Sequence, residues 1–395
     1  MNARKETVIV LYSHIVGLAL IRALGRRGIP IVVLHYLPAE MGYVSKHVWR
    51  HIRITSPTVN GESFISDILA LAGSYPGALL VPTDDYTVVA LSKNRERLAK
   101  HFRVVVEDWS IVKRVVKKQY TYELAGQIGV PCPRTALCET PEDIEKRIGE
   151  FEFPCLLKPC EGHQFFDIYR KKVLVVRDIT ELRARYQELQ DFKIAVMLQE
   201  IIPGKSCEGV NYNSYFIGGE PAAEFTAEKV RVDPPFFGSP RVIVSKKIPQ
   251  IIEPGRKLIK ALGYSGFSCM EFKRDVRDGV YKLMEINARH NLSGSLAVAC
   301  GIDFPWIMYR DLVDDRKECA TAFREGIYWI DLTKDAMRFI VSRKAEGYSV
   351  AEYLNPYFHK HIFAILDIRD PLPFLKRSVD ILKKGTFGFG NPNYA

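Results

Sequence analysis

Residues 281–291, YKLMEINARHN, place an acid, an amide and a guanidinium at every second position. Side chains of a strand alternate between its two faces, so Glu285, Asn287 and Arg289 would share one face with Leu283. The opposite face would be mostly apolar. Burying three polar or charged side chains against an apolar core is costly, so we expect this face to contact a ligand.

A second acid, Glu271, lies in the preceding segment FSCMEFK, and a turn around Gly279 predicts an antiparallel hairpin. The hairpin would bring Glu271 beside Glu285 and Asn287. Carboxylate and amide oxygens suit Mg²⁺ rather than zinc, and Mg²⁺ held in this way usually carries phosphates. The alternative is a solvated sheet face on which Arg289 pairs with an acid. Three such residues on an otherwise apolar hairpin favour a metal site.

Other polar residues stand where apolar segments end. Lys158 ends FPCLLKP, where an ammonium group has little structural reason to lie unless an anion faces it. Gln199 and Glu200 end a second apolar segment, Glu208 follows the next turn, and Lys118 belongs to a helical stretch. Each is weak evidence alone, since a lysine at a strand end is more often solvated. Their order along the chain is more informative.

The order is a lysine on a helix, GVPCP, a strand ending in KP, a strand ending in QEIIPG, a later acid and EINAR. In this order the chain resembles the ATP-grasp superfamily, and within it the predicted carboxylate-amine ligases related to D-aspartate ligase. The segments FEFPCLLKP, IIPGKS and LGYSGFSCMEFKRDVRDGVYKLMEINAR carry the resemblance, which covers residues 1 to about 315.

The resemblance implies two α+β lobes that clasp ATP, and a carboxylate that attacks the γ-phosphorus to give an acyl phosphate, which an amine then displaces. It also implies ATP with one or two Mg²⁺ ions, or Mn²⁺, as cofactors. The implied site residues are Lys118 and Lys158 at the ATP phosphates, Gln199, Glu200 and Ile202 at the adenine hinge, Glu208 at the ribose, Glu271, Glu285 and Asn287 as metal ligands, and Arg289 at the transferred phosphoryl group.

The chain departs from many ATP-grasp enzymes after the KP strand, where it reads KPCEGHQFFDIYRKK with Gly162 as the single glycine. D-aspartate ligase also lacks a glycine-rich loop there, so loss of activity does not follow. His163, Lys171 and Lys172 are candidates for covering the phosphates instead.

Substrate-binding groups are less determined by the pattern. Asp84 and Asp85 would lie at the carboxyl end of a parallel strand, where α/β sheets bind ligands, although Asp85 could equally be a helix N-cap. His14, in the first strand-to-helix turn, is similarly ambiguous. Basic residues near 241–247 could meet a substrate carboxylate, but such residues on a strand pair more often face solvent; they are Arg241, Lys246 and Lys247.

The first hundred residues, which must position these groups, alternate strand and helix signals. Strands are predicted at TVIVLY, IPIVVLHY, HIRIT, ALLVPTDD and FRVVV, with helices between them, which predicts a parallel sheet wrapped by helices. Only Gly17 occupies the first turn, so the GxGxxG fingerprint of dinucleotide enzymes is absent. One basic amphipathic helix is predicted from Ser110 to about Val130.

The remaining chain mixes antiparallel strands with helices. We predict an N-terminal Rossmann-like α/β domain at residues 1–112, an ATP-grasp N-lobe at 113–204, a C-lobe with the metal site at 205–315 and a mostly helical extension at 316–395. The fold class is therefore α/β and α+β.

Composition excludes several classes of protein. The chain has 395 residues, 47% hydrophobic and 26% charged, which is typical of a globular protein with more than one core. The net charge of +10 favours anionic ligands, but the basic residues are scattered, so a nucleotide is a better candidate than nucleic acid. The eight cysteines form no CxxC pair, and no segment reaches the length of a membrane span. We expect a cytoplasmic protein with free thiols and no membrane partner.

Three functions are compatible with parts of this pattern. An ATP-dependent carboxylate-amine ligase, with small-molecule acid and amine substrates and a homodimer as the default assembly, accounts for the ordered residues from Lys118 to Arg289. A nucleotide-binding sensor or assembly partner without ligase activity would not need all three metal ligands. An NAD-dependent oxidoreductase rests only on the N-terminal pattern and fails on the missing glycines.

Overall fold

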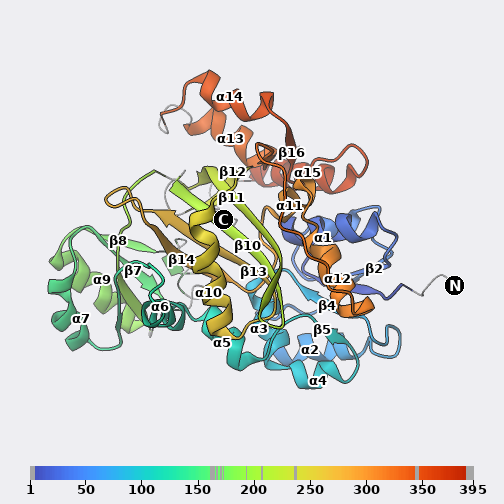
Figure 1. Ribbon diagram of the computed structural model, residues 1–395, viewed down its shortest axis with the longest axis horizontal. Helices are drawn as coiled ribbons and strands as arrows, with labels where there is room; N and C mark the ends of the chain where they lie inside the picture. Colours follow the sequence, from blue (N-terminus) through green and yellow to red (C-terminus); the bar gives the residue numbers. More distant parts are fainter. Residues whose placement is uncertain are drawn as a thin grey trace.

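The structure is a computed structural model that describes residues 5–160, 165, 168–169, 171, 173–192, 194–205, 208–234, 238–342 and 347–387. The strands of these residues form three sheets (Figure 1).

The first sheet is parallel, as predicted, and has the strand order β3-β2-β1-β4-β5. Its strands are β1 (Val8–Leu11), β2 (Ile31–His35), β3 (Arg50–Arg53), β4 (Leu79–Pro82) and β5 (Arg103–Val104), and its helices are α1 (Ile15–Gly25), α2 (Gly61–Leu69), α3 (Asp85–Lys93) and α4 (Arg95–Ala99). The strand order reverses between β1 and β4, and sheets of this kind bind ligands at the carboxyl ends of the two strands beside such a reversal, a position called the crevice below.

The helical region that follows is broken, and the prediction of one helix there was wrong. The structure has α5 (Trp109–Val116) and α6 (Lys118–Gln127), and Lys117 between them is extended, with φ −85° and ψ 101°. Because of this break Lys118 is the first residue of a new helix, where its side chain can point away from the helix before it.

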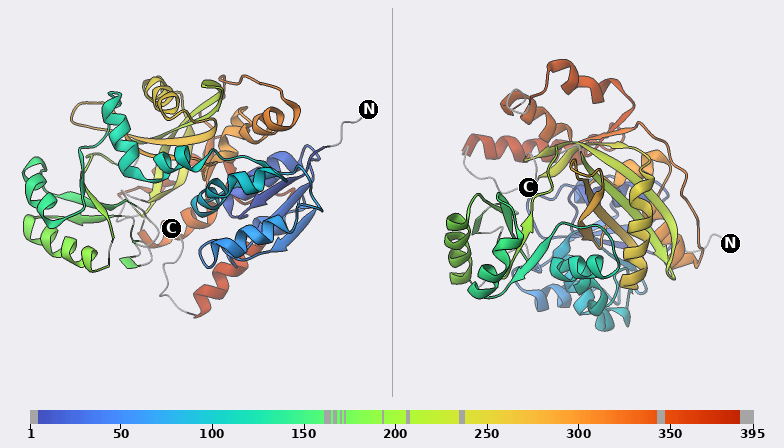
Figure 2. Two further views of the ribbon diagram at one scale, coloured as in Figure 1. Left: turned by 90° about the horizontal axis from the view of Figure 1, so that it is seen from below. Right: turned by 60° about the vertical axis from the view of Figure 1, so that its left-hand side comes forward.

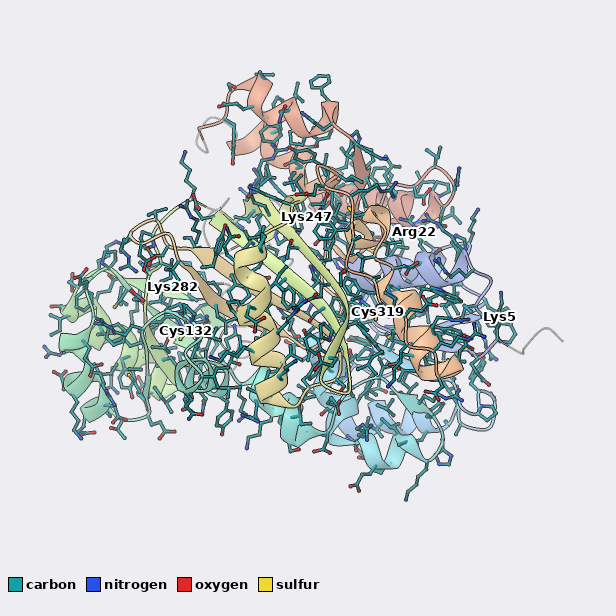
Figure 3. The ribbon with its side chains drawn as sticks, viewed as in Figure 1. Lys5, Arg22, Cys132, Lys247, Lys282 and Cys319 are labelled. Carbon is teal, nitrogen blue, oxygen red and sulfur yellow. The ribbon has the colours of Figure 1, made fainter. Side chains whose placement is uncertain are left out.

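The second sheet is small and antiparallel, with the order β6-β9-β7-β8. It consists of β6 (Thr135–Cys138), β7 (Cys155–Pro159), β8 (Leu174–Val176) and β9 (Val196–Glu200), and α7 (Pro141–Arg147) and α9 (Ile179–Asp191) pack on it around a core of its own. Cys132 and Lys282 lie where this lobe meets the third sheet (Figure 3).

The third sheet has seven strands in the order β14-β13-β10-β11-β12-β15-β16. Its strands are β10 (Gly209–Ile217), β11 (Glu220–Asp233), β12 (Ser239–Ser245), β13 (Gly266–Arg274), β14 (Tyr281–Asn287), β15 (Tyr328–Ile330) and β16 (His361–Phe363). One face packs with α10 (Ile252–Leu262), and the other with α11 (Gly294–Cys300) and α12 (Phe304–Asp314). Both cores also contain residues of the parallel sheet, and α1 contacts α11 and α12, so the N-terminal domain packs against this sheet through those helices.

The predicted hairpin is present as β13 and β14, but strict alternation along β14 was wrong. Glu271 pairs with Glu285 whereas Phe272 pairs with Leu283, so β14 carries one extra residue at Met284. The bulge changes which face each side chain occupies: Leu283 joins the apolar core instead of sharing a face with Glu285. The carbonyl of Met284 accepts hydrogen bonds from the hydroxyl of Tyr122 and from Nζ of Lys158.

The region from 316 onward was predicted as a mostly helical extension, and two of its segments instead lengthen the large sheet as β15 and β16. Its helices are α13 (Leu332–Ser342), α14 (Val350–Phe358) and α15 (Leu372–Phe387). The last of these lies beside the N-terminal domain (Figure 2). Among the helices of the described residues, none has the length and apolar character needed to cross a membrane.

Candidate functional site

Glu271 and Glu285 lie opposite each other on β13 and β14, and each contacts a lysine from another element. Lys229 of β11 pairs with Glu271, and Nζ of Lys118 lies 3.3 Å from Oε2 of Glu285. Like charges directly across a sheet destabilise it. The two ammonium groups offset that repulsion, and the pair of acids therefore forms the centre of a charged cluster drawn from four elements.

Asn287 and Arg289 extend this cluster to the N-terminal domain. The guanidinium of Arg289 donates to Oδ1 of Asn287 at 3.3 Å, and to the two carboxylate oxygens of Asp85 at 2.7 and 3.0 Å. Burial lowers the pKa of Arg289, but Asp85 outweighs that effect and the pKa is raised. Asp85 begins α3 just after β4, so the carboxyl edge of the parallel sheet forms one wall of the site.

Lys158 lies at the end of β7, opposite the bulge of β14. Its Nζ donates to the hydroxyl of Tyr122 at 2.5 Å, and to Oε1 of Gln199 and the carbonyl of Met284, both at 3.3 Å. The side chain is 7% exposed. Burial, and then the positive charge of Lys118, lower the pKa of Lys158 to about 7. All three partners are neutral, so an anion that entered here would meet an ammonium group with no opposing carboxylate in direct contact.

The oxygen set fits a divalent cation of the magnesium type. Glu271, Glu285 and Asn287 present two carboxylates and an amide, and Asn211, across from Glu271 on β10, keeps a buried Oδ1 without a hydrogen-bond partner. No group of three or more His, Cys, Asp or Glu residues that could hold a metal is found in the described ranges. A metal would therefore need an amide oxygen or ligand phosphates as well, which is how Mg²⁺ usually binds.

The segment between β9 and β10 was predicted as an adenine hinge, and its roles stay predictions. Lys273 donates to the carbonyl of Ile202 at 2.8 Å, which ties the segment to β13. Glu200 accepts from Arg277 at 3.0 Å, while Glu208 is half-buried beyond the segment. Burial raises the pKa of Glu200, but its hydrogen bonds and cationic neighbours lower it below its ordinary value. The side chain of Gln199 points instead toward Lys158.

Sequence reasoning missed three members of the cluster: Lys229, Tyr122 and Asn211. Lys229 is only 9% exposed and lies in the alternating segment EFTAEKVRV. The criterion applied to Lys158, a cation with no structural reason to be buried, would have found it. The position of Tyr122 depends on how the small lobe meets β14, for which the sequence has no signal.

Arg241 does not contribute to the cluster. It is fully buried and its Nε donates to Oδ1 of Asp335 at 3.0 Å, and Arg231 donates to the same carboxylate. These three residues hold β11 and β12 to α13 and are structural. Lys246 and Lys247 are exposed and pair with glutamates, as expected of a solvated face.

Three further predictions concern the crevice and the loop after β7. Asp84, rather than Asp85, is the N-cap of α3 and accepts from the backbone N–H of Thr87 at 2.8 Å. His14 is the residue before α1, at the carboxyl end of β1. Of the residues proposed to cover the phosphates, Lys171 is exposed, and His163 and Lys172 lie outside the described residues.

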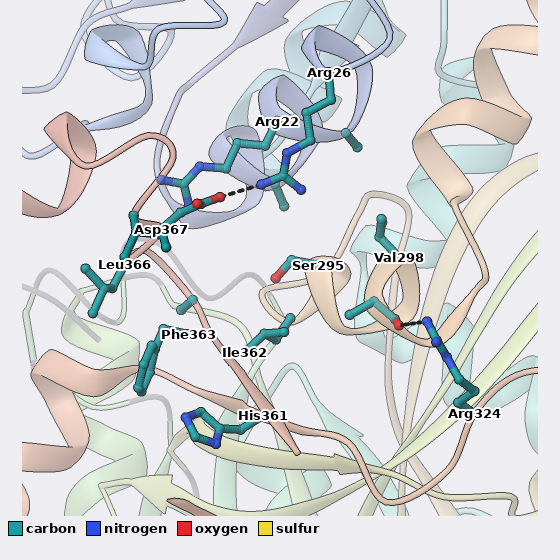
Figure 4. Close-up of a pocket in the computed structure, with 15 residues that line it drawn as sticks. Arg22, Arg26, Ser295, Val298, Arg324, His361, Ile362, Phe363, Leu366 and Asp367 are labelled. Carbon is teal, nitrogen blue, oxygen red and sulfur yellow. Dashed lines mark hydrogen bonds and ion pairs between the residues drawn. The ribbon is translucent and has the colours of Figure 1, made fainter.

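A cavity of about 560 Å³ lies elsewhere, between α1, α11 and the segment after β16 (Figure 4). Its arginines are already engaged: Arg22 and Arg26 pair with Asp370 and Asp367, and Arg324 donates to a backbone carbonyl. No catalytic candidate predicted from the sequence lines this cavity, and the predicted residues meet at the carboxylate cluster instead.

Comparison with known sequences gives similarity to amino-acid ligases. The chain is 23% identical over 262 residues to D-aspartate ligase of Enterococcus faecium, covering 62% of this chain and 61% of that protein. It is 26% identical over 203 residues to a D-alanine–D-alanine ligase of Alkalilimnicola ehrlichii, covering 48% of this chain and 62% of that protein. The chain thus spans about three fifths of the length of these relatives. No protein-family model matches it.

Solved structures share the fold over most of the chain. An L-amino acid ligase from Bacillus licheniformis superposes with a TM-score of 0.62 at 17% identity, covering 79% of this chain and 75% of that one. A second match is the biotin carboxylase domain of Hydrogenobacter thermophilus 2-oxoglutarate carboxylase, in complex with MgADP, ADP and bicarbonate. It superposes with a TM-score of 0.66 at 17% identity, covering 82% of this chain and 73% of that one. At such identities the likeness shows the fold alone.

Proposed function

We propose that this chain, which has the ATP-grasp fold, is an ATP-dependent carboxylate-amine ligase that works through an acyl phosphate. The observation that carries the proposal is the opposed pair Glu271 and Glu285, with Asn287 beside it and cationic groups of Lys118 and Lys229 in contact with it. Relatives named as ligases of D-aspartate, D-alanine and L-amino acids support an amino acid as one substrate.

Glu271, Glu285 and Asn287 would hold the metal, which neutralises charge on the terminal phosphates of ATP when bound. Lys158, at the end of β7, binds phosphate oxygens, and Lys118 and Lys229 turn from the carboxylates to the phosphates. The hinge between β9 and β10 receives the adenine, with Glu208 at the ribose. The contacts of Lys118 and Lys229 with the two carboxylates support the phosphate and metal roles, and the roles at the adenine and the ribose are supported by the resemblance.

Arg289 orients two groups: the substrate carboxylate, and the phosphoryl group that this carboxylate attacks. Two anions about 4 Å apart repel by roughly 4 kcal/mol at an effective dielectric constant of 20, so the reaction depends on cations that are already in place. The ion pair with Asp85 keeps the guanidinium fork extended toward the crevice. We further expect a cytoplasmic homodimer.

The test is amine-dependent ADP release from MgATP across a panel of amino acids, comparing the wild type with Glu285→Gln. We expect the variant to lose roughly 10² to 10³ in rate, as for loss of one strong transition-state contact. Glu220→Gln, at an exposed ion pair of β11, is the matched control and should keep its activity. MgATP binding without ADP release for any acid and amine would instead identify a nucleotide-binding protein without ligase activity.

A further inference from the structure

Two histidines of the N-terminal domain meet on one face of the parallel sheet, where β2 pairs with the edge strand β3. In the register of these strands Val33 lies opposite His51, and His35 lies opposite Arg53. His35 and His51 are therefore diagonal neighbours on the same face, because side chains two residues apart on a strand point the same way. Nε2 of His35 lies 3.3 Å from Nδ1 of His51, so one ring nitrogen of each imidazole points at the other.

A hydrogen bond and a metal ion are alternative ways to fill the gap between these two nitrogens. A hydrogen bond needs one ring to donate and the other to accept, and bonds from N–H to oxygen usually span about 2.7–3.2 Å. A tetrahedral ion with two bonds of about 2.0–2.1 Å to imidazole nitrogens would separate those nitrogens by about 3.3–3.4 Å. The observed separation of 3.3 Å between His35 and His51 matches the metal geometry better than the hydrogen bond.

The two rings are held in place by a tyrosine. Tyr43, in the short helix η1 (Gly42–Val44), stacks on His35 with ring centroids 4.4 Å apart and 15° between the planes, and its ring lies 5.2 Å from that of His51. Because the nitrogens already face each other, an ion would meet ligands that need little ordering, which favours binding. His51 is exposed, so an ion reaches the pair directly from solution.

The charges around the pair decide which ions it accepts. Burial, followed by His51, lowers the pKa of His35, so its ring is neutral at pH 7 and offers a lone pair. Two cations, Arg53 and Lys376, lower it further. Lys376 is paired with Asp380 at 2.7 Å, and Arg53 is exposed, so its guanidinium can turn to solvent. Neutral imidazoles suit Zn²⁺, Ni²⁺ and Cu²⁺, whereas Mg²⁺ prefers oxygen ligands, so the pair differs chemically from the carboxylate cluster.

We propose that Nε2 of His35 and Nδ1 of His51 bind a divalent transition-metal ion of the Zn²⁺, Ni²⁺ and Cu²⁺ type. Among the residues that the structure describes, no third His, Cys, Asp or Glu joins the pair, so water or a small anion fills the remaining coordination positions. β3 has β2 as its single neighbour in the sheet, and the ion therefore fastens the edge strand to the rest of the domain. The inference is independent of the proposed function.

The test is calorimetric titration of the full, untagged chain with ZnCl₂ and with NiCl₂ at pH 8, in a buffer that does not chelate metals. Excess Mg²⁺ is present throughout, to occupy the oxygen ligands of the carboxylate cluster. His51→Gln removes one of the two ligands at an exposed position. His101→Gln removes an exposed histidine on another part of the domain and is the matched control. Electron paramagnetic resonance with Cu²⁺ reports nitrogen ligands directly.

We expect the wild type and His101→Gln to bind Zn²⁺ and Ni²⁺ equally well. His51→Gln should bind them at least about 10- to 100-fold more weakly, since even the loss of a group that supports a metal ligand has an effect of this size. The bound ion should raise the Tm of the wild type by mass action and slow hydrogen exchange in β3, and both effects should disappear in His51→Gln. The Cu²⁺ spectrum should show imidazole nitrogens in the wild type and lose them in His51→Gln.

Two results would overturn the inference: equal affinities of His51→Gln and His101→Gln, or no binding of Zn²⁺, Ni²⁺ or Cu²⁺ to the wild type at millimolar concentrations. A second measurement uses no variant. Protons compete with a metal for imidazole, so the affinity of the wild type for Zn²⁺ should fall as the pH is lowered from 8 to 5.5. An affinity that did not change over this range would exclude histidine ligands.

Discussion

Glu271 of β13 and Glu285 of β14 are a directly opposed cross-strand pair, and each is in contact with a lysine from a different part of the chain, Lys229 and Lys118. Two acids in this position repel each other, so the pair stabilises nothing by itself. The lysines and a divalent cation are alternative ways to offset that repulsion. Lys229 and Lys118 offset the repulsion in this structure, and under the proposed function a divalent cation would take over that role.

This relationship predicts a metal-dependent stability change for Lys229→Met. Without Mg²⁺ the variant should lose about 1–3 kcal/mol, because Glu271 is left half-buried beside Glu285 with no cation. Added Mg²⁺ should raise its Tm more than that of the wild type. Denaturation with and without Mg²⁺ measures both effects, and Lys260→Met, at an exposed ion pair, is the control. An identical response to Mg²⁺ in variant and wild type would contradict the assignment of Glu271 as a ligand.

The buried ammonium group of Lys158 predicts proton uptake on nucleotide binding. Its pKa is lowered to about 7, so the side chain is largely neutral at pH 8–9 in the free protein. ATP phosphates favour the charged form, so binding should raise the pKa and take up a proton, and affinity should fall as the pH rises above 7. Calorimetry at pH 8 in buffers of different ionisation enthalpy measures the uptake. Lys158→Met should bind the nucleotide weakly and without this pH dependence. If the affinity of the wild type for the nucleotide did not change between pH 7 and 9, Lys158 would not be the phosphate-binding group.

Arg289→Met separates catalysis from nucleotide binding. Arg289 contacts Asn287 and Asp85 at the crevice, away from the hinge, so we expect the affinity for MgATP to change little. The rate of ADP release should fall by about 10² to 10³. Single-turnover measurement at saturating MgATP provides the rate. A variant that lost nucleotide affinity but kept its rate would show that the guanidinium binds ATP instead.

Asp335→Asn should act on stability rather than on the reaction. The carboxylate is fully buried between Arg231 and Arg241, and breaking a buried pair of this kind typically costs about 3–5 kcal/mol. Chemical denaturation measures the loss. Under conditions in which the variant remains folded, its KM for ATP should match that of the wild type. A changed KM for a substrate acid would instead indicate that Arg241 contacts the substrate.

Docking of the C-terminal region can be tested through Asp370→Asn. The wild-type carboxylate is buried and accepts hydrogen bonds from Arg22 and Ser45, so the substitution should cost about 1–3 kcal/mol and expose the segment before α15 to proteases. Asp367→Asn removes a more exposed ion pair with Arg26 and is the comparison, with little expected effect. Equal protease resistance in both variants would show that Asp370 does not fasten the tail.

Local patterns in the sequence were enough to predict the parallel N-terminal sheet, the hairpin and the meeting of Glu271 with Glu285. Hydrophobic alternation and turn residues act between neighbours along the chain, and the hairpin is a local structure. The same reasoning failed at Met284, where one extra residue moved Leu283 to the other face. A bulge leaves no composition signal that separates it from regular alternation.

Tertiary structure alone decided which distant groups complete the site. Lys229, Asp85 and Tyr122 reach the hairpin from β11, which is separated from it by β10, from α3 of the N-terminal domain and from α6. Each of these contacts depends on how packed elements are oriented, not on residue spacing along one element. The sequence thus determined that Glu271 and Glu285 face each other on one hairpin. The packing of the sheets and helices determined which charged groups surround them, because charges far apart in the chain are brought together only by burial of the apolar faces that carry them.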